Sequence, residues 1–195
     1  MQDVSARAGG GGKTDARLRR AHDRILRLAR PPAAEPSAAY YLADGDPEID
    51  ALMESVGAQT GGVARVEIAA LSRGAFPETG RVADRALETA KKPSQHAWVQ
   101  RLKRTLYAAQ YNWARRFFER HPGAVAIAWN GRTSTRYAFM EGARHAGVPR
   151  LYLERAPLPG RVTVDPRGIN AVNSVPRDRA AFEAWAGDSP RRRGQ

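Results

Sequence analysis

The sequence predicts an α/β protein built on a Rossmann-like parallel sheet flanked by helices. Short apolar segments alternate with helical segments twice, first over residues 38–71 and again over residues 124–154. This alternation is typical of strand–helix–strand units, whose strands pair in parallel and whose helices cover the sheet. The 195 residues, 42% of them hydrophobic, are enough for one domain with a buried core.

The first unit begins with AAYYLA (38–43) and ends with VARVEIAAL (63–71), both predicted to be short buried strands. Between them, DPEIDALMESV (46–56) has the apolar spacing of a helix. Asp46 is a suitable cap for this helix and Pro47 a suitable first residue.

Two helical segments follow, over residues 81–90 and 94–121. In the second, large apolar side chains recur at helical spacing and indicate core packing rather than a cofactor contact. These are Trp98, Leu102, Leu106, Trp113 and Phe117. The opposite face carries Arg101, Lys103, Arg104, Arg115 and Arg116.

The second unit runs from the apolar strand AVAIAW (124–129) through a helix at 134–147 to the strand VPRLYLE (148–154). Ser134 is the predicted cap of the helix and Gly147 its terminator. Ligand groups in such sheets gather beyond the carboxyl ends of the strands. We therefore expect Asn130 and Glu154, which follow or end these two strands, to face one crevice.

The composition predicts three regions: a basic Gly/Pro-rich flexible arm (1–37), the α/β domain (38–186) and a basic flexible tail (187–195). GGGGKT in the arm fails as a phosphate loop, because Arg7 stands where the first glycine belongs. The chain has no cysteine and shows neither a signal peptide nor a membrane span, which favours the cytoplasm.

A net charge of +12 allows two interpretations. It can attract nucleic acid, anionic lipid or phosphorylated ligands, or it can be a solvated background produced by a chain rich in arginine, alanine and glycine. No nucleic-acid reader motif appears, so no specific nucleic-acid partner is expected. The four histidines lack paired spacing, so no metal site is expected.

The motifs of residues 124–180 resemble a known family. They are WNG (129–131), AGVP (146–149), YLERAPLPG (152–160), VDPRGIN (164–170) and NSVPRD (173–178). Their order resembles the KpsS-type proteins of capsule polysaccharide biosynthesis and export, which carry Glu-x-Gly-x-x-Pro, Asp-x-x-Gly-x-Asn and Asn-Ser-x-Pro-Arg. Ala156 stands where the family has glycine.

The resemblance implies a retaining β-Kdo transferase that uses CMP-Kdo as donor substrate, needs no other cofactor, and acts on a phospholipid or glycolipid acceptor. Such enzymes have two Rossmann-like halves in a glycosyltransferase-B arrangement, and this chain resembles the acceptor-side, N-terminal half. It implies a partner chain for the donor half, inactivity without it, and peripheral attachment to the anionic inner face of the inner membrane. The alternatives are a non-catalytic truncated remnant and a basic nucleic-acid-binding protein.

In sugar transfer with retention, one carboxylate attacks the anomeric carbon and a second group exchanges a proton with the acceptor oxygen. In retaining glycosidases the two carboxyl groups are about 5 to 5.5 Å apart. We expect Asp165 as nucleophile or stabiliser of the oxocarbenium-like state and Glu154 as acid/base. In the alternative, Asp165 only begins the DPRG turn and Glu154 pairs with a surface arginine.

The remaining candidates bind substrate. The sugar hydroxyls or carboxylate are expected to contact neutral groups on Asn130, Gly131, Asn170, Asn173 and Ser174. Arg177 is expected to pair with a carboxylate or phosphate. Asn-Gly and Asn-Ser are also ordinary turn sequences, and this alternative stays open.

Overall fold

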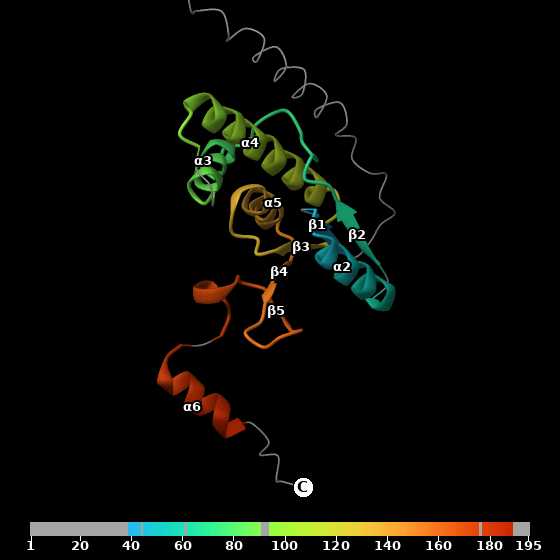
Figure 1. The fold of residues 1–195 in the computed structure, drawn as a ribbon, viewed down its shortest axis with the longest axis vertical. Helices are drawn as coiled ribbons and strands as arrows, with labels where there is room; N and C mark the ends of the chain where they lie inside the picture. The colour runs from blue at the N-terminus through green and yellow to red at the C-terminus, as the bar shows by residue number, and fades with distance from the viewer. Residues whose placement is uncertain (1–38, 44, 61, 91–93, 176, 189–195) are drawn as a thin grey trace, which may run out of the picture.

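The computed structural model describes residues 39–43, 45–60, 62–90, 94–175 and 177–188. A five-stranded sheet in the order β2-β1-β3-β4-β5 lies between helices (Figure 1). The strands are β1 (Ala39–Leu42), β2 (Val63–Val66), β3 (Val125–Trp129), β4 (Arg150–Arg155) and β5 (Val162–Asp165). The helices are α2 (Pro47–Thr60), α3 (Thr79–Glu88), α4 (Ala97–Glu119), α5 (Ser134–His145), the 3-10 turn η1 (Asn170–Val172) and α6 (Arg179–Asp188).

The strand topology confirms the predicted α/β class with one difference. β1 pairs in parallel with β2 and with β3, and β3 pairs in parallel with β4. β5 is antiparallel to β4. Only a short turn joins these two strands, whereas a parallel neighbour requires a crossover of a dozen or more residues. The sheet is therefore mixed.

Side chains alternate between the two faces of the sheet, and each face has its own core. Tyr41, Ile127 and Leu153 pack with Ile49 and Met53 of α2, which defines the α2 face. On the other face, the α4–α5 face, Tyr40, Ala128 and Tyr152 pack with aromatic side chains of both helices. These aromatic side chains are Trp113, Phe117, Phe118 and Phe139.

Local chemistry sets the ends of the helices. The Asp46 carboxylate accepts the Glu48 N–H at 3.0 Å, so Asp46 caps α2 as predicted. α5 ends at His145, and Gly147 just beyond it (φ 78°) acts as the predicted terminator: the Gly147 and Val148 N–H groups bond to carbonyls of the last turn. The predicted cap of α5 was wrong by one residue: the helix begins at Ser134, and the residue in the cap position is Thr133, whose side chain makes no capping hydrogen bond.

The apolar stripe predicted along α4 is only partly buried. Trp113 and Phe117 are in the core, but Trp98 is 52% exposed, so its assignment to the core was wrong. With 23 residues, α4 is about 34 Å long, whereas the 10-residue α3 beside it spans about 15 Å. Among the described residues, α3 is therefore too short to lie beside the whole of α4, and Trp98 is in the first turn of α4.

The predicted basic face of α4 is largely engaged within the protein. Arg104 contacts Asp84 through two hydrogen bonds of 2.5 and 3.1 Å. Arg115 pairs with Glu78 at 2.6 Å and lies 4.1 Å above the Phe76 ring. These arginines are therefore not a free cationic stripe.

The boundaries of the predicted arms are not tested. Residues 1–38, which include GGGGKT, and residues 189–195 lie outside the described part of the chain. The predicted tail begins at 187, where α6 still continues to Asp188. Among the described residues, no helix is long and apolar enough to cross a membrane.

Candidate functional site

The turn after β3 brings the backbone close to β4 at the carboxyl edge of the sheet. Asn130 and Gly131 both have left-handed backbones, with φ of 64° and 63°. A Cβ on Gly131 would lie 2.4 Å from the ring of Tyr152. Only glycine fits this position without a shift of the ring. The predicted Asn-Gly turn is therefore present, and the structure assigns Gly131 a packing role.

Asn130 and Glu154, which the sequence predicted to face one crevice, are in direct contact. The Asn130 Nδ2 donates a hydrogen bond to Glu154 Oε2 at 3.2 Å, and the Asn130 backbone N–H donates to the Leu153 carbonyl at 2.7 Å. Both residues are half-buried. One carboxylate is thus fixed by a neutral amide and stays partly open to solvent, which suits a group that exchanges a proton.

Sequence reasoning missed a third member of this site, Arg136. It lies in the first turn of α5, and burial lowers its pKa while the negative charge of Glu154 opposes that shift. The guanidinium therefore contributes positive charge beside Glu154. Its place at the start of the helix that follows β3 is a signal that could have identified it, because such helix starts face the carboxyl edge.

Asp165 lies at the end of β5 and is 4% exposed. Its Oδ1 accepts the Arg167 and Gly168 N–H groups at 2.8 and 3.0 Å, and its Oδ2 accepts the N–H at 2.8 Å and the hydroxyl of Ser174. Burial raises the pKa of Asp165, but these hydrogen bonds outweigh burial and lower it to about 2. The alternative in which Asp165 begins the DPRG turn agrees with this geometry.

Glu154 and Asp165 lie on the same face of the sheet. Asp165 is opposite Tyr152 and Glu154 is opposite Thr163 in the antiparallel register. Because Tyr152 belongs to the α4–α5 face, alternation places Glu154 and Asp165 there too. Such diagonal neighbours lie about 7–8 Å apart, with their Cβ atoms somewhat closer. In the described part of the chain, no three acidic or histidine side chains gather as metal ligands would.

The other predicted binding residues form a separate cluster in the loop after β5. The Arg177 guanidinium donates to the Asn170 carbonyl and, at 3.1 Å, to Asn173 Oδ1. Asn170 has a left-handed backbone (φ 50°) where η1 begins. Arg177 is thus engaged with its own loop, and Ser174 with Asp165. The structure brings together Asn130 with Glu154, Asp165 with Ser174, and Arg177 with both loop asparagines.

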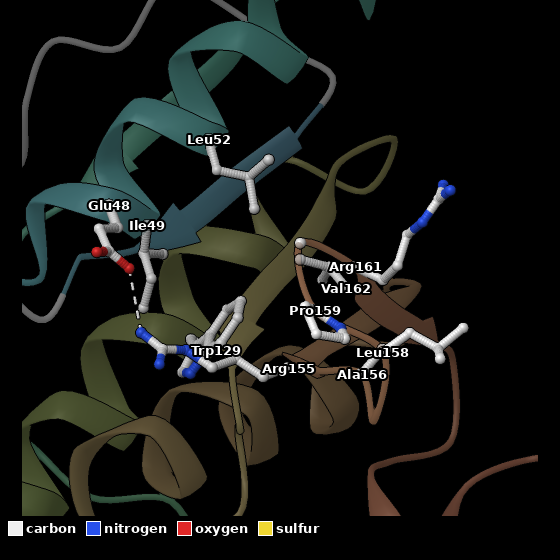
Figure 2. A pocket seen from close by; sticks show the side chains of 11 residues that line it. Glu48, Ile49, Leu52, Trp129, Arg155, Ala156, Leu158, Pro159, Arg161 and Val162 are labelled. Atoms are coloured by element: carbon white, nitrogen blue, oxygen red, sulfur yellow. Dashed lines mark hydrogen bonds and ion pairs between the residues drawn. The ribbon is translucent and has the colours of Figure 1, made fainter.

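A cleft of about 440 Å³ lies on the α2 face (Figure 2). It includes none of the predicted site residues. Its lining comes from the start of α2, the end of β3 and the β4–β5 hairpin, with Glu48, Ile49, Leu52, Trp129, Arg155, Ala156, Leu158, Pro159, Gly160, Arg161 and Val162. We call it the hairpin cleft. The sequence held a signal for this cleft, because successive side chains of a strand point to opposite faces of the sheet. In WNG and YLER, Trp129 and Arg155 therefore point to the face opposite to that of Asn130 and Glu154.

The fold and these two sites define an α/β protein with polar groups at the carboxyl edge of its sheet. No protein-family model and no solved structure matches the chain. Protein FixF of Sinorhizobium fredii (strain NBRC 101917 / NGR234) is 27% identical over 96 residues, a match that covers 46% of this chain. The chain spans 21% of the length of FixF. The name FixF states no reaction.

Proposed function

We propose that the chain is the acceptor-side half of a retaining glycosyltransferase of capsular polysaccharide biosynthesis. The contact between Asn130 and Glu154 at the carboxyl edge supports this proposal most directly. The KpsS-type motifs point to CMP-Kdo as donor and to a phospholipid or glycolipid as acceptor. A partner chain or domain supplies the donor-binding half.

Glu154 acts as the acid/base that exchanges a proton with the acceptor hydroxyl. The Asn130 amide holds one carboxylate oxygen, and the Arg136 guanidinium carries positive charge nearby. An ionised carboxylate can accept a proton from a hydroxyl group as the new bond to the sugar forms. The half-buried position of Glu154 leaves room for the acceptor.

Asp165 acts in this proposal by holding the loop of residues 165–174 in place. An ionised carboxylate offers about four lone-pair sites, and the four donors from Arg167, Gly168 and Ser174 match that number. Attack on a sugar carbon by Asp165 requires the loss of at least one of these bonds. The expected nucleophile role is therefore less compatible with this geometry than a positioning role.

The positive charge of the chain supports a location of the protein at the inner face of the inner membrane. Anionic lipid attracts basic segments close to the surface by about 1 kcal/mol per Lys or Arg. The net charge of +12 is of the sign that this contact needs. Peripheral attachment from the cytoplasm is thus part of the proposal.

The test joins this chain to the donor-binding half of a KpsS-type transferase. CMP release and incorporation of radiolabelled Kdo into a lysophospholipid are measured for the wild type and for Glu154→Gln. Loss of proton transfer should lower the rate by about 10² to 10⁴. Glu88→Gln on α3, which removes an exposed carboxylate paired with Arg85, is the matched control and should keep full activity.

Two outcomes would count against the assignment. Full transfer by the Glu154→Gln protein would remove Glu154 from the mechanism. No transfer by any joined protein, with circular dichroism showing a folded chain, would favour the non-catalytic remnant.

A further inference from the structure

The hairpin cleft lies at the point where the strand connections of the sheet diverge. β1 leads through α2 to β2 on one side, while its neighbour β3 leads through α5 to β4 on the other. In open α/β sheets, ligands bind beyond the carboxyl ends of two such strands. The cleft takes Glu48 and Ile49 from the helix after β1 and Trp129 from the end of β3. It therefore occupies the place where the topology favours a ligand.

The walls of the cleft are mostly apolar and include one aromatic ring. Ile49 and Leu52 form one side, and Leu158, Pro159 and Val162 form the other (Figure 2). The Trp129 indole lies between them and is only partly buried in the core of the α2 face. A volume of about 440 Å³ falls within the roughly 300–1,000 Å³ of small-molecule sites. Stacking on an aromatic ring suits a flat ring of any base.

Two guanidinium groups at the cleft give it a positive character. Arg155 lies beside Trp129 and pairs with Glu48 at 3.1 Å, and both partners of this pair are largely exposed, at 73% and 80%. Arg161 is exposed on the opposite side, and its guanidinium has no hydrogen bond or ion pair to any of the described residues. An exposed pair of this kind contributes little, so an anion can displace Glu48 from Arg155.

The connection between β1 and α2 helps to orient the ligand. It reads ADGDP (43–47), without the glycine-rich sequence that holds a pyrophosphate in dinucleotide-binding folds. Asp46, whose carboxylate accepts the N–H of the cleft residue Glu48, repels an anion at that end of the cleft. The anionic part of a ligand is therefore directed to the arginines of the hairpin, and its ring to Trp129.

We propose that the hairpin cleft binds a phosphorylated ring compound, a nucleoside monophosphate or a sugar phosphate, with its ring on Trp129 and its phosphate on Arg155, while Arg161 on the opposite side adds positive charge that attracts the anion. Guanidinium groups are suited to phosphate because they donate two parallel hydrogen bonds. This site lies on the α2 face, away from Glu154, and its binding does not depend on sugar transfer. Under this proposal, the chain binds a ligand without the donor-binding half.

The test is a binding titration of the purified chain, by calorimetry in low-salt buffer, because salt screens exposed charges. The probes are CMP, glucose 1-phosphate, cytidine, inorganic phosphate and octyl phosphate. At least one of CMP and glucose 1-phosphate should bind at least about tenfold more tightly than cytidine or inorganic phosphate. Cytidine has only the ring and inorganic phosphate only the anion, so each makes only part of the contacts. CMP against glucose 1-phosphate distinguishes the two sources of the ring.

Variants locate the site. Trp129→Leu should weaken binding of the preferred probe by about fivefold to 150-fold through loss of stacking. Arg161→Gln should weaken it as well, and its exposed position keeps the fold intact if Trp129→Leu fails to fold. Glu48→Gln should strengthen binding, because it frees Arg155 and removes a negative charge. Arg85→Gln, an exposed paired arginine on α3, is the control and should change nothing.

Each contrary result overturns the proposal. If neither CMP nor glucose 1-phosphate binds at millimolar concentration, the cleft is not such a site. Octyl phosphate binding in preference to both would assign it to an amphiphile. Equal weakening by Arg161→Gln and Arg85→Gln would indicate unspecific attraction to a basic chain. Transfer activity of the joined enzyme is measured separately from binding to the cleft. The binding proposal and the proposed function can therefore be contradicted independently of each other.

Discussion

At the scale of single residues, Gly131 combines a left-handed backbone with a neighbour that fills the space of a side chain. An L-residue in this conformation costs about 1–2 kcal/mol, and overpacking adds about 1–3 kcal/mol. A Cβ here would lie 2.4 and 2.7 Å from two atoms of the Tyr152 ring. Gly131→Ala should therefore lower the free energy of unfolding by about 2–5 kcal/mol in urea titrations.

Gly123→Ala is the matched control for this prediction. Gly123 has no positive φ, and a Cβ there meets nothing within 4 Å. We expect a change within about 0.5 kcal/mol, as for ordinary surface substitutions. An equal loss of stability in both variants would show that contact with Tyr152 is not the cause.

The second residue-scale prediction concerns Asp165. In Asp165→Asn, the amide NH₂ group would face N–H or O–H groups that donate hydrogen bonds to the carboxylate in the wild type. Two donors cannot bond to each other, so the free energy of unfolding should fall by about 2–4 kcal/mol at neutral pH. The pKa of Asp165 is lowered in the folded state to about 2 from an ordinary 3.8. Its stabilisation is therefore fully present above about pH 5 and is lost as the pH falls through 3.8 towards 2.

Urea titrations of wild type and variant at several pH values check this sign. Their difference should be constant above about pH 5 and shrink on acidification. Asp178→Asn is the control: this exposed aspartate accepts the Ala181 N–H at 2.7 Å, and asparagine caps helices equally well. A difference that grows as the pH falls would contradict the assignment of hydrogen bonds to Asp165.

At the scale of elements, periodicity and turn residues predicted most of the sheet. The strands at 39–42, 125–129 and 150–155 and the helix at 47–60 lie where the apolar runs and Asp46 placed them. The contact of Asn130 with Glu154 followed from strand ends meeting at one edge. Contacts that depend on distant packing, such as the exposure of Trp98, were not predictable from local spacing.

The loop after β5 shows a second limit of the sequence. Asp165, Asn173 and Arg177 were predicted to face a ligand, yet each binds atoms of its own loop. The residue types that bind sugars are the same types that close turns, so a single sequence does not separate the two roles. The hairpin cleft was missed because its lining combines three segments distant in sequence.

The packing of α4 against α5 gives an element-scale prediction at Gly142. A Cβ there would lie 2.6 Å from Ala114 Cβ and 2.8 Å from the Arg115 backbone nitrogen. Alanine in a helix gains about 1 kcal/mol over glycine, but the clash with a backbone atom costs about 1–3 kcal/mol or more. Gly142→Ala should therefore lower the melting temperature despite its better helix propensity.

Gly80→Ala in α3 separates propensity from packing. A Cβ on Gly80 would lie 3.6 Å from the Arg104 guanidinium, an ordinary contact. This variant should raise the stability by up to about 1 kcal/mol. Stabilisation by both substitutions would contradict close packing of α4 on α5.

At the scale of the whole molecule, many charged side chains of the described residues form ion pairs with one another. Several arginines of the described surface are held by carboxylates, as Arg104 is by Asp84 and Arg144 by Glu141. Unspecific binding to nucleic acid needs many free cations along a backbone. Such a surface favours limited contacts, as with anionic lipid or one phosphate, over a continuous nucleic-acid track.

The last prediction concerns the chain alone and the chain joined to a donor-binding half. A two-domain transferase holds donor and acceptor between its halves, and orienting the reactants supplies much of the rate. Under the proposed function, this chain supplies Glu154 on the acceptor side, and the donor-binding half comes from a partner. Alone, it should transfer little Kdo from CMP-Kdo to a lysophospholipid, even if the hairpin cleft binds CMP, because a ligand on the α2 face is separated from Glu154 by the sheet. Joined to the donor half, it should transfer. Radiolabel incorporation by both proteins at equal concentration measures the difference, and transfer by the isolated chain at the rate of the joined protein would show that no second half is required.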